Sequence, residues 1–258
     1  MNAASVFMLA GLALSPLLSA QAVELNDQFS LLITPTLVSD YRANGLSQTK
    51  GDPAAQLAVT LSHASGLYAG IWTSNVNFGY GSKARQEIEY YAGYAWQISD
   101  NISLDTFYTR YEYPRESGYN QSDVQTVLDV YGVLLGGKYV TNMQGPEYED
   151  ENGEFHEGKK DEDLSTFFVG YRTLLPAEFG LELRYEYVDY KDKVFFSDSG
   201  KGRADYTDWE IKPTRDFVGV SWGLSYIDTS LSKAECQSYT GYDDVCGATL
   251  LASASKTF

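Results

Sequence analysis

Residues 218–226 read VGVSWGLSY, and their alternation decides the fold class. One parity holds only glycine and serine, whereas the other holds Val218, Val220, Trp222, Leu224 and Tyr226. Successive side chains of a β-strand point to opposite faces, so this segment predicts a strand with one apolar and one small, polar face. The same period of two recurs in residues 88–98 and 181–187, whose second face carries glutamate, glutamine and arginine.

The same period predicts about twelve strands after residue 22. Each has roughly ten residues, the length that crosses a bilayer when the strand is tilted. We expect these strands at residues 28–39, 54–63, 67–77, 86–98, 102–113, 124–135, 138–143, 164–174, 179–190, 206–213, 217–229 and 247–258.

The connections between these strands alternate strictly in length. The short ones are residues 64–66, 99–101, 136–137, 175–178 and 214–216. The long ones are residues 40–53, 78–85, 114–123, 144–163, 191–205 and 230–246. Tight turns at one end and long loops at the other are typical of outer-membrane barrels. A soluble sandwich would not explain the polar interior parity. The predicted fold is all-β, an up-and-down antiparallel transmembrane β-barrel.

The first 22 residues contain no charged side chain. An apolar run over residues 6–18 precedes Ala20 and Ala22, the small residues of a cleavage site. This run is too short to span a membrane, so we expect a signal peptide at residues 1–22, cleaved after Ala22, and a barrel at residues 23–258. A buried N-terminal helix is the alternative.

Charge and cysteine content narrow the class further. The net charge of −16 leaves no basic surface for phosphates, which argues against nucleic acid as a partner. Cys236 and Cys246 are the only two cysteines, and in an exported chain they predict one disulfide that closes a short loop. Two free thiols are the alternative. Neither histidine is near them in sequence, and no metal or cofactor is expected.

Several blocks of the chain resemble a known family. They are SDYRANGLSQTKGDPAAQ (39–56), GLYAGIWTSNVNF (66–78), EIEYYAGYAW (87–96), YEYP (111–114), DYTDWEI (205–211), LSYIDTS (224–230) and SKTF (255–258). Together they resemble the porins called the TorF family, across essentially the whole chain after residue 22. The resemblance implies a passive channel in the outer membrane of a Gram-negative bacterium. The terminal Phe258 resembles the signal that the barrel-assembly machinery recognises.

The loop at residues 40–53 lies on the predicted extracellular side. Asn44 and Gly45 suit a left-handed turn, and Pro53 starts the next strand. One hypothesis is that Tyr41 and Arg42 fold back over the mouth of the barrel, with Arg42 pairing to lumen carboxylates. The other is that Arg42 faces solvent in a well-formed loop.

Charged residues on the inner parity are the candidate pore-lining groups. By alternation they are Glu87, Glu89, Asp105, Arg172, Glu182, Arg184 and Glu186. They could form salt bridges that stiffen a narrow barrel, or a charged constriction that selects ions. Glu182, Arg184 and Glu186 are about 7 Å apart along one strand, so we expect them to need partners elsewhere, such as Arg172.

Other polar segments carry weaker signals. Residues 147–163 hold nine carboxylates but lack the glycine that a calcium loop requires, so we expect a solvated loop that concentrates cations at the mouth. Catalysis is not expected. His63 and Ser62 are adjacent in a strand and point to opposite faces, and no nucleophile-elbow or zinc-protease motif occurs.

The sequence therefore predicts an outer-membrane channel for small hydrophilic solutes or ions, surrounded by outer-membrane lipid. Twelve strands enclose a narrower bore than the 16–18 of general porins. Excess negative charge favours cations. The alternative is a barrel that does not conduct and serves surface interaction or adhesion through its long loops.

Overall fold

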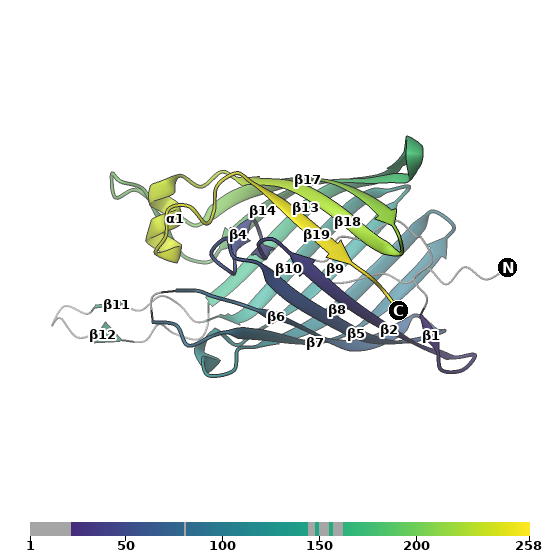
Figure 1. The fold of residues 1–258 in the computed structure, drawn as a ribbon. Helices are drawn as coiled ribbons and strands as arrows, with labels where there is room; N and C mark the ends of the chain where they lie inside the picture. Colours follow the sequence, from purple (N-terminus) through teal and green to yellow (C-terminus); the bar gives the residue numbers. More distant parts are fainter. Residues whose placement is uncertain (1–21, 80, 144–147, 150–154, 157–161) are drawn as a thin grey trace.

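The chain closes into a twelve-stranded antiparallel barrel (Figure 1). The structure, a computed structural model, describes residues 22–79, 81–143, 148–149, 155–156 and 162–258. Neighbouring strands in the chain are neighbours in the barrel, and the last pairs with the first. The strands are β2 (Phe29–Val38), β5 (Ala54–His63), β6 (Leu67–Asn75), β7 (Gln86–Ser99), β8 (Ile102–Glu112), β9 (Gln121–Val130), β10 (Val133–Met143), β13 (Glu162–Leu175), β14 (Phe179–Tyr190), β17 (Asp205–Phe217), β18 (Val220–Thr229) and β19 (Thr249–Ser255).

The smaller elements lie in the connections. The long loops gather at the end of the barrel that carries α1 (Lys233–Thr240) (Figure 1). Short paired strands occur within these loops: β3 (Arg42–Ala43) with β4 (Leu46–Ser47), β11 (Tyr148–Glu149) with β12 (Phe155–His156), and β15 (Phe195–Phe196) with β16 (Gly202–Arg203). The remaining elements are β1 (Val23–Glu24) and the 3-10 turns Ser117–Tyr119 and Pro176–Glu178.

Backbone pairing between β19 and β2 closes the barrel. Ser253 to Ser255 lie opposite Val38 to Thr36. Beyond the end of β19, the Phe258 amide donates to the Ile33 carbonyl and the Ile33 amide donates back to the Phe258 carbonyl, both at 3.0 Å. Strand β19 is shorter than the predicted 247–258, but its backbone pairing with β2 continues to Phe258.

The predicted alternation of faces is confirmed. Trp222 and Leu224 in β18 are half exposed on the outer surface. Ser225, which lies between Leu224 and Tyr226, is buried. Along β7, Glu87, Glu89 and Tyr91 are likewise buried. Among the described residues, no helix is long and apolar enough to cross a membrane.

Two predicted turns are wrong. One was placed at a pair of glycines, and the other directly after a proline. Gly136 and Gly137 lie inside β10, paired to β9 and β13. The Phe168 ring covers Gly136 so closely that a Cβ there would meet it at 2.1 Å. The hairpin instead turns at Tyr131 and Gly132, both with positive φ.

The tenth strand also continues further than predicted. Pro213 lies within β17, and the ladder to β18 resumes at Thr214 after skipping the proline. The turn follows at Val218 and Gly219, with φ of 55° and 69°. A β-branched residue disfavours positive φ, so the sequence pattern placed these residues in the next strand.

Two segments carry predictions that the structure does not test. The signal peptide at residues 1–22 lies outside the described residues except for its last residue. The acidic segment 147–163 also lies outside them, apart from the backbone of β11 and β12 and its last two residues.

Inward tyrosines lie across glycines of the neighbouring strand. Tyr91 is opposite Gly70 and Tyr68 is opposite Gly93, and each ring occupies the space that a Cβ would need. The Tyr68 hydroxyl then donates to Asp105 at 2.7 Å. These contacts tie β6, β7 and β8 together inside the barrel.

Gly93→Val should therefore destabilise the barrel. Its Cβ would meet the Tyr68 hydroxyl at 2.3 Å and the Phe107 Cβ at 2.6 Å, which displaces the ring and leaves Asp105 without this donor. We expect the free energy of unfolding to fall by roughly 2 kcal/mol, measured by urea titration with heat-modifiable gel mobility. Gly247→Val is the matched control, because no described atom lies within 4 Å of a Cβ there. Equal losses in both variants would contradict the proposed contact.

Candidate functional site

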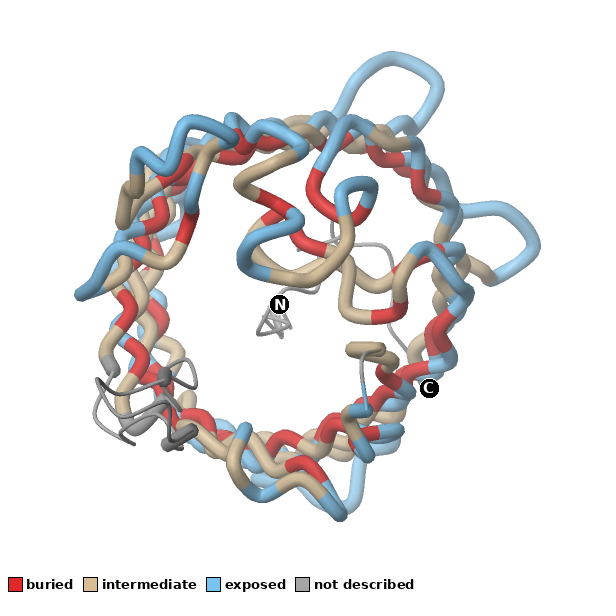
Figure 2. Tube along the Cα trace, turned by 90° about the vertical axis from the view of Figure 1, so that its left-hand side faces the viewer, coloured by how far each residue is buried: buried red, intermediate tan, exposed pale blue. Residues whose placement is uncertain are grey.

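The polar inner face and the folded-in loops enclose one large cavity, called the chamber below. Its volume is about 1350 Å³. Seen from the long-loop end, Figure 2 shows chain segments lying inside the ring of strands. The barrel wall contributes the charged lining residues Glu87, Glu89, Asp123, Lys138, Arg184, Glu186, Asp208 and Glu210.

The loop between β2 and β5 is organised by Asp40. This carboxylate is buried and accepts from Arg42 Nε at 2.8 Å, from Thr49 Oγ1 at 2.9 Å and from Ser47 Oγ. Arg42 Nη1 also donates to the Gly45 carbonyl. Three residues of the loop thus donate to a single buried anion, which gives the loop a fixed shape without a ligand.

The same loop is attached to the barrel wall on several strands. The Tyr41 hydroxyl donates to Glu87 on β7 at 3.0 Å. Lys138 on β10 donates to the Asn44 side chain at 3.1 Å, and Tyr206 on β17 donates to the Asn44 carbonyl at 2.8 Å. The loop therefore crosses the bore between opposite parts of the wall, and it narrows the passage.

Gly45 is required where the loop meets the wall. Its φ is +78°, and a Cβ would meet Thr229 at 2.5 Å and Asp208 at 2.9 Å. Asn44 before it also has positive φ, so the two form the tight turn between β3 and β4. The sequence correctly indicated this left-handed turn.

Arg42 differs from both expectations for it. Its side chain is only 5% exposed, so it does not face solvent. It pairs with Asp40 of its own loop rather than with Glu87 or Glu89. Tyr41, rather than Arg42, contacts the lumen carboxylates, because its hydroxyl donates to Glu87.

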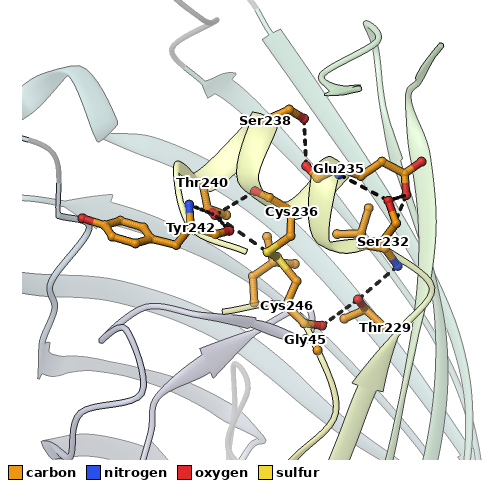
Figure 3. Close-up of a disulfide and its surroundings, with 12 residues drawn as sticks. Gly45, Thr229, Ser232, Glu235, Cys236, Ser238, Thr240, Tyr242 and Cys246 are labelled. Carbon is orange, nitrogen blue, oxygen red and sulfur yellow. Dashed lines mark hydrogen bonds between the residues drawn. A yellow bond between two sulfur atoms is a disulfide. The ribbon is translucent and has the colours of Figure 1, made fainter. Parts of the chain in front are cut away.

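A second loop holds the first in place. The predicted disulfide between Cys236 and Cys246 is confirmed, and it joins α1 to the segment before β19 (Figure 3). Arg42 donates to the Gly247 carbonyl at 2.9 Å, and the Ser47 amide donates to the Val245 carbonyl at 2.9 Å. A buried apolar cluster surrounds this junction; it comprises Leu46, Val140, Leu164, Val188, Phe195, Tyr206, Leu231, Cys236, Val245 and Cys246.

Helix α1 has a complete N-terminal capping box. The Ser232 hydroxyl accepts from the Glu235 amide, and the Glu235 carboxylate accepts from the Ser232 amide (Figure 3). Partial burial opposes ionisation, but the bonds from Ser232 and the charge of Arg203 hold the pKa of Glu235 below its usual range. The helix is therefore capped by a charged carboxylate at its positive end.

One wall of the chamber combines carboxylates with tyrosines. Glu87 accepts from Tyr41 at 3.0 Å and from Tyr113 at 2.9 Å. Burial and the neighbouring Glu87 charge raise the pKa of Tyr41 and of Tyr113 well above the usual value, so both hydroxyls stay protonated donors. On β9, Asp123 accepts from Tyr111 at 2.7 Å.

Two charged residues of β14, Arg184 and Glu186, pair along their own strand. Arg184 Nη2 lies 2.8 Å from Glu186 Oε2. The arginine side chain spans the spacing between alternate Cα atoms, so these two neighbours pair directly, while Glu182 forms no ion pair with Arg184 among the described residues. Arg184 and Glu186 line the chamber together with Asp208 on β17.

Three predicted pore-lining residues do not line the chamber: Asp105, Arg172 and Glu182. Asp105 is buried and accepts from Tyr68. Arg172 lies opposite Glu182 in the β13–β14 ladder, but its guanidinium bonds to Asp129 on β9. All three lie nearer the short turns. The bonds of Asp105 and Arg172 stiffen the wall, because they join β6 to β8 and β9 to β13 across the strand between them.

Sequence reasoning missed four lining groups. Asp123 fell in a predicted loop because the strand was begun at residue 124. Lys138 was placed at a strand start beside the supposed glycine turn. Asp208 and Glu210 follow the inward parity of their strand and could have been chosen on that signal. Among the described residues, no group of three or more His, Cys, Asp or Glu is arranged to hold a metal ion.

Asp40→Ala should free the folded-in loop. The variant leaves the buried Arg42 guanidinium without its anion and removes the acceptor shared by Ser47 and Thr49. We expect trypsin to cleave after Arg42 or Lys50 in the folded protein at least about tenfold faster. Asp52→Ala, an exposed position of the same loop, is the control and should stay as resistant as the parent. Equal resistance of the Asp40 variant would show that other contacts hold the loop.

Replacing both cysteines by serine should loosen α1 without opening the barrel. A bridge across ten residues contributes about 3 kcal/mol through loop closure. We therefore expect faster hydrogen exchange in residues 230–248 and unchanged exchange in residues 179–190, followed by mass spectrometry. Faster exchange in both regions would mean that the bridge supports the whole barrel.

Comparisons with known proteins agree with the geometry. Solved structures of the NanC porin, in a rhombohedral crystal form, and of the KdgM porin are similar in fold. Their TM-scores are 0.52 and 0.50, at 9% and 8% sequence identity. Each alignment covers 88% of this chain, with 98% of the NanC chain and 99% of the KdgM chain.

The sequence comparisons point to one family. No protein with a curated description matches the chain. The family model described as "Bacterial protein of unknown function (Gcw_chp)" matches residues 26–258. The chain therefore belongs to the Gcw_chp family of bacterial proteins, and its fold is a porin-like β-barrel.

Proposed function

We propose that the chain is an outer-membrane channel for the passive diffusion of small hydrophilic solutes and ions. The observation that carries this proposal is a closed barrel with an apolar outer face and a charged, polar chamber inside it. In lipid, the backbone N–H and C=O groups of a β-sheet are all hydrogen-bonded only if the sheet closes into a barrel. A polar interior is typical of porins.

The cellular context belongs to the same proposal. A porin-like barrel supports a place in the outer membrane of a Gram-negative bacterium, with export through a signal peptide cleaved after Ala22. Phe258 would present the terminal aromatic to the barrel-assembly machinery, and its backbone already pairs with β2. The finer assignment to the TorF porins rests on the sequence blocks quoted above. Passive diffusion requires no catalytic group.

The narrowed passage favours cations over anions. The loop carrying Asp40 leaves the chamber bounded on one side by Glu87, Glu89 and Asp123, all buried in the wall. Lys138 lies among them but donates to Asn44 of the loop. Charged side chains that line a narrow bore contribute to the ion selectivity of a channel.

A planar bilayer experiment tests this proposal. With refolded protein under a tenfold KCl gradient, we expect discrete current steps. The reversal potential should lie between zero and the equilibrium potential of potassium, as for a cation-selective channel. Glu87→Gln removes the charge and keeps an acceptor oxygen for one of its two tyrosine donors, Tyr41 or Tyr113, so the reversal potential should move toward zero. Asp198→Asn, on the exposed β15–β16 hairpin, removes the same charge and should leave it unchanged.

Other results would change the proposal in defined ways. Steps with anion preference would retain the channel and remove the selectivity argument. A correctly folded, heat-modifiable barrel without steps would favour a scaffold that acts through its long loops.

A further inference from the structure

Five buried carboxylate oxygens of chamber-lining residues have no hydrogen-bond partner among the described residues: Glu89 Oε2, Asp123 Oδ1, both oxygens of Glu186, and Asp208 Oδ2. The Arg184 guanidinium lies 2.8 Å from Glu186, and its charge also acts on Asp208. Glu89 on β7 and Asp123 on β9 differ from these two, because no ion pair joins either of them to an arginine among the described residues. Glu89 is 3% exposed and Asp123 is 2% exposed, so little solvent reaches either of them. Both residues line the chamber.

The surrounding tyrosines cannot supply these missing donors. Tyr41 and Tyr113 already donate to Glu87, and Tyr111 donates to the other oxygen of Asp123. A phenol has one hydrogen to donate, so each of these hydroxyls can only accept a further bond. The Lys138 ammonium also lines this wall, and it donates to the Asn44 side chain. A ligand that binds at Glu89 and Asp123 would therefore bring donors of its own.

The positions of the strands bring the two oxygens to the same part of the wall. Glu89 lies opposite Tyr111 in the β7–β8 ladder, and Asp123 lies opposite Thr109 in the β8–β9 ladder. Tyr111 and Thr109 are two residues apart and point to the same face. Glu89 and Asp123 thus flank Tyr111, and their charges act on its hydroxyl and on each other.

The missing partner is best matched by a cationic nitrogen group. Burying an unpaired carboxylate oxygen is costly, and an N–H donor that carries positive charge offsets both the lost hydrogen bond and the charge. A divalent metal would need more oxygen ligands in a defined geometry, and no such group occurs among the described residues. The face of a tyrosine ring also attracts an ammonium or guanidinium group.

We propose that Glu89 and Asp123 form a binding subsite for the ammonium or guanidinium group of an organic amine, which passes through or is retained in the chamber. The route to the subsite rests on the proposed channel function, whereas the subsite itself rests on the two unpartnered oxygens. A chamber of about 1350 Å³ leaves room for the rest of such a solute beside the charged group.

Binding to the folded full-length mature protein in detergent tests the subsite without requiring conduction. Propylammonium chloride and tetramethylammonium chloride are titrated at constant ionic strength by calorimetry. We expect propylammonium to bind at least about tenfold more tightly, because tetramethylammonium has no N–H to donate. Equal affinity for the two cations would overturn the proposal, since general electrostatic attraction would then explain both.

Matched variants locate the binding. Glu89→Gln and Asp123→Asn keep the shape of each side chain, and each should weaken propylammonium binding at least about tenfold. Asp198→Asn removes one carboxylate from an exposed hairpin and should leave the affinity unchanged. Heat-modifiable gel mobility verifies that every variant is folded. Unchanged affinity in both chamber variants would place the binding elsewhere and overturn the proposal.

The bilayer recordings separate this inference from the channel. If current steps occur in KCl and propylammonium blocks the parent and Glu89→Gln equally, the channel is retained and the subsite is rejected. If propylammonium binds in detergent in a way that depends on Glu89 and Asp123, but no current steps occur, the subsite is retained and the channel is rejected.

Discussion

Closure of the backbone ladder is the constraint on which the rest of the structure depends. A strand in an apolar medium has no water for its amide and carbonyl groups, so every strand must have two neighbours. The seam between β19 and β2 meets this requirement, and it continues to Phe258. Once the sheet is closed, alternate side chains must lie inside, and a polar interior follows from the sequence pattern.

The closed wall then becomes the support for the loops. A barrel of this size is partly filled by its own side chains, and the loop around Asp40 occupies more of the bore. Its ties to β7, β10 and β17 hold it across the passage, and the loop closed by Cys236 and Cys246 packs against it from the long-loop end. The passage is therefore shaped by two loops acting together, which makes the narrowing a property of the fold rather than of one side chain.

The charged groups inside the barrel fall into two classes. Arg172 pairs with Asp129, and Arg184 pairs with Glu186, so each of these carboxylates has a guanidinium beside it in the wall. The wall of Glu87, Glu89 and Asp123 is different, because tyrosine hydroxyls satisfy only part of its acceptors. Unequal pairing places the carboxylates without an arginine partner on one side of the chamber, and this asymmetry is the physical basis of the proposed preference for positively charged solutes.

The sequence by itself determined the fold class, the twelve strands and the inward parity of Glu87 and Glu89; it offered the folded-back Tyr41 as one of two hypotheses and the disulfide as the expectation over two free thiols. These features depend on alternation, spacing and turn residues, which are local. Only the tertiary structure decided that Gly136 packs beneath Phe168 within a strand, that Arg42 pairs with Asp40, and that Asp123 joins Glu89 across β8. Those choices depend on which residues from distant strands meet across a closed sheet, and the physical reason they escape a sequence reading is that local periodicity specifies a face but not the partner on it.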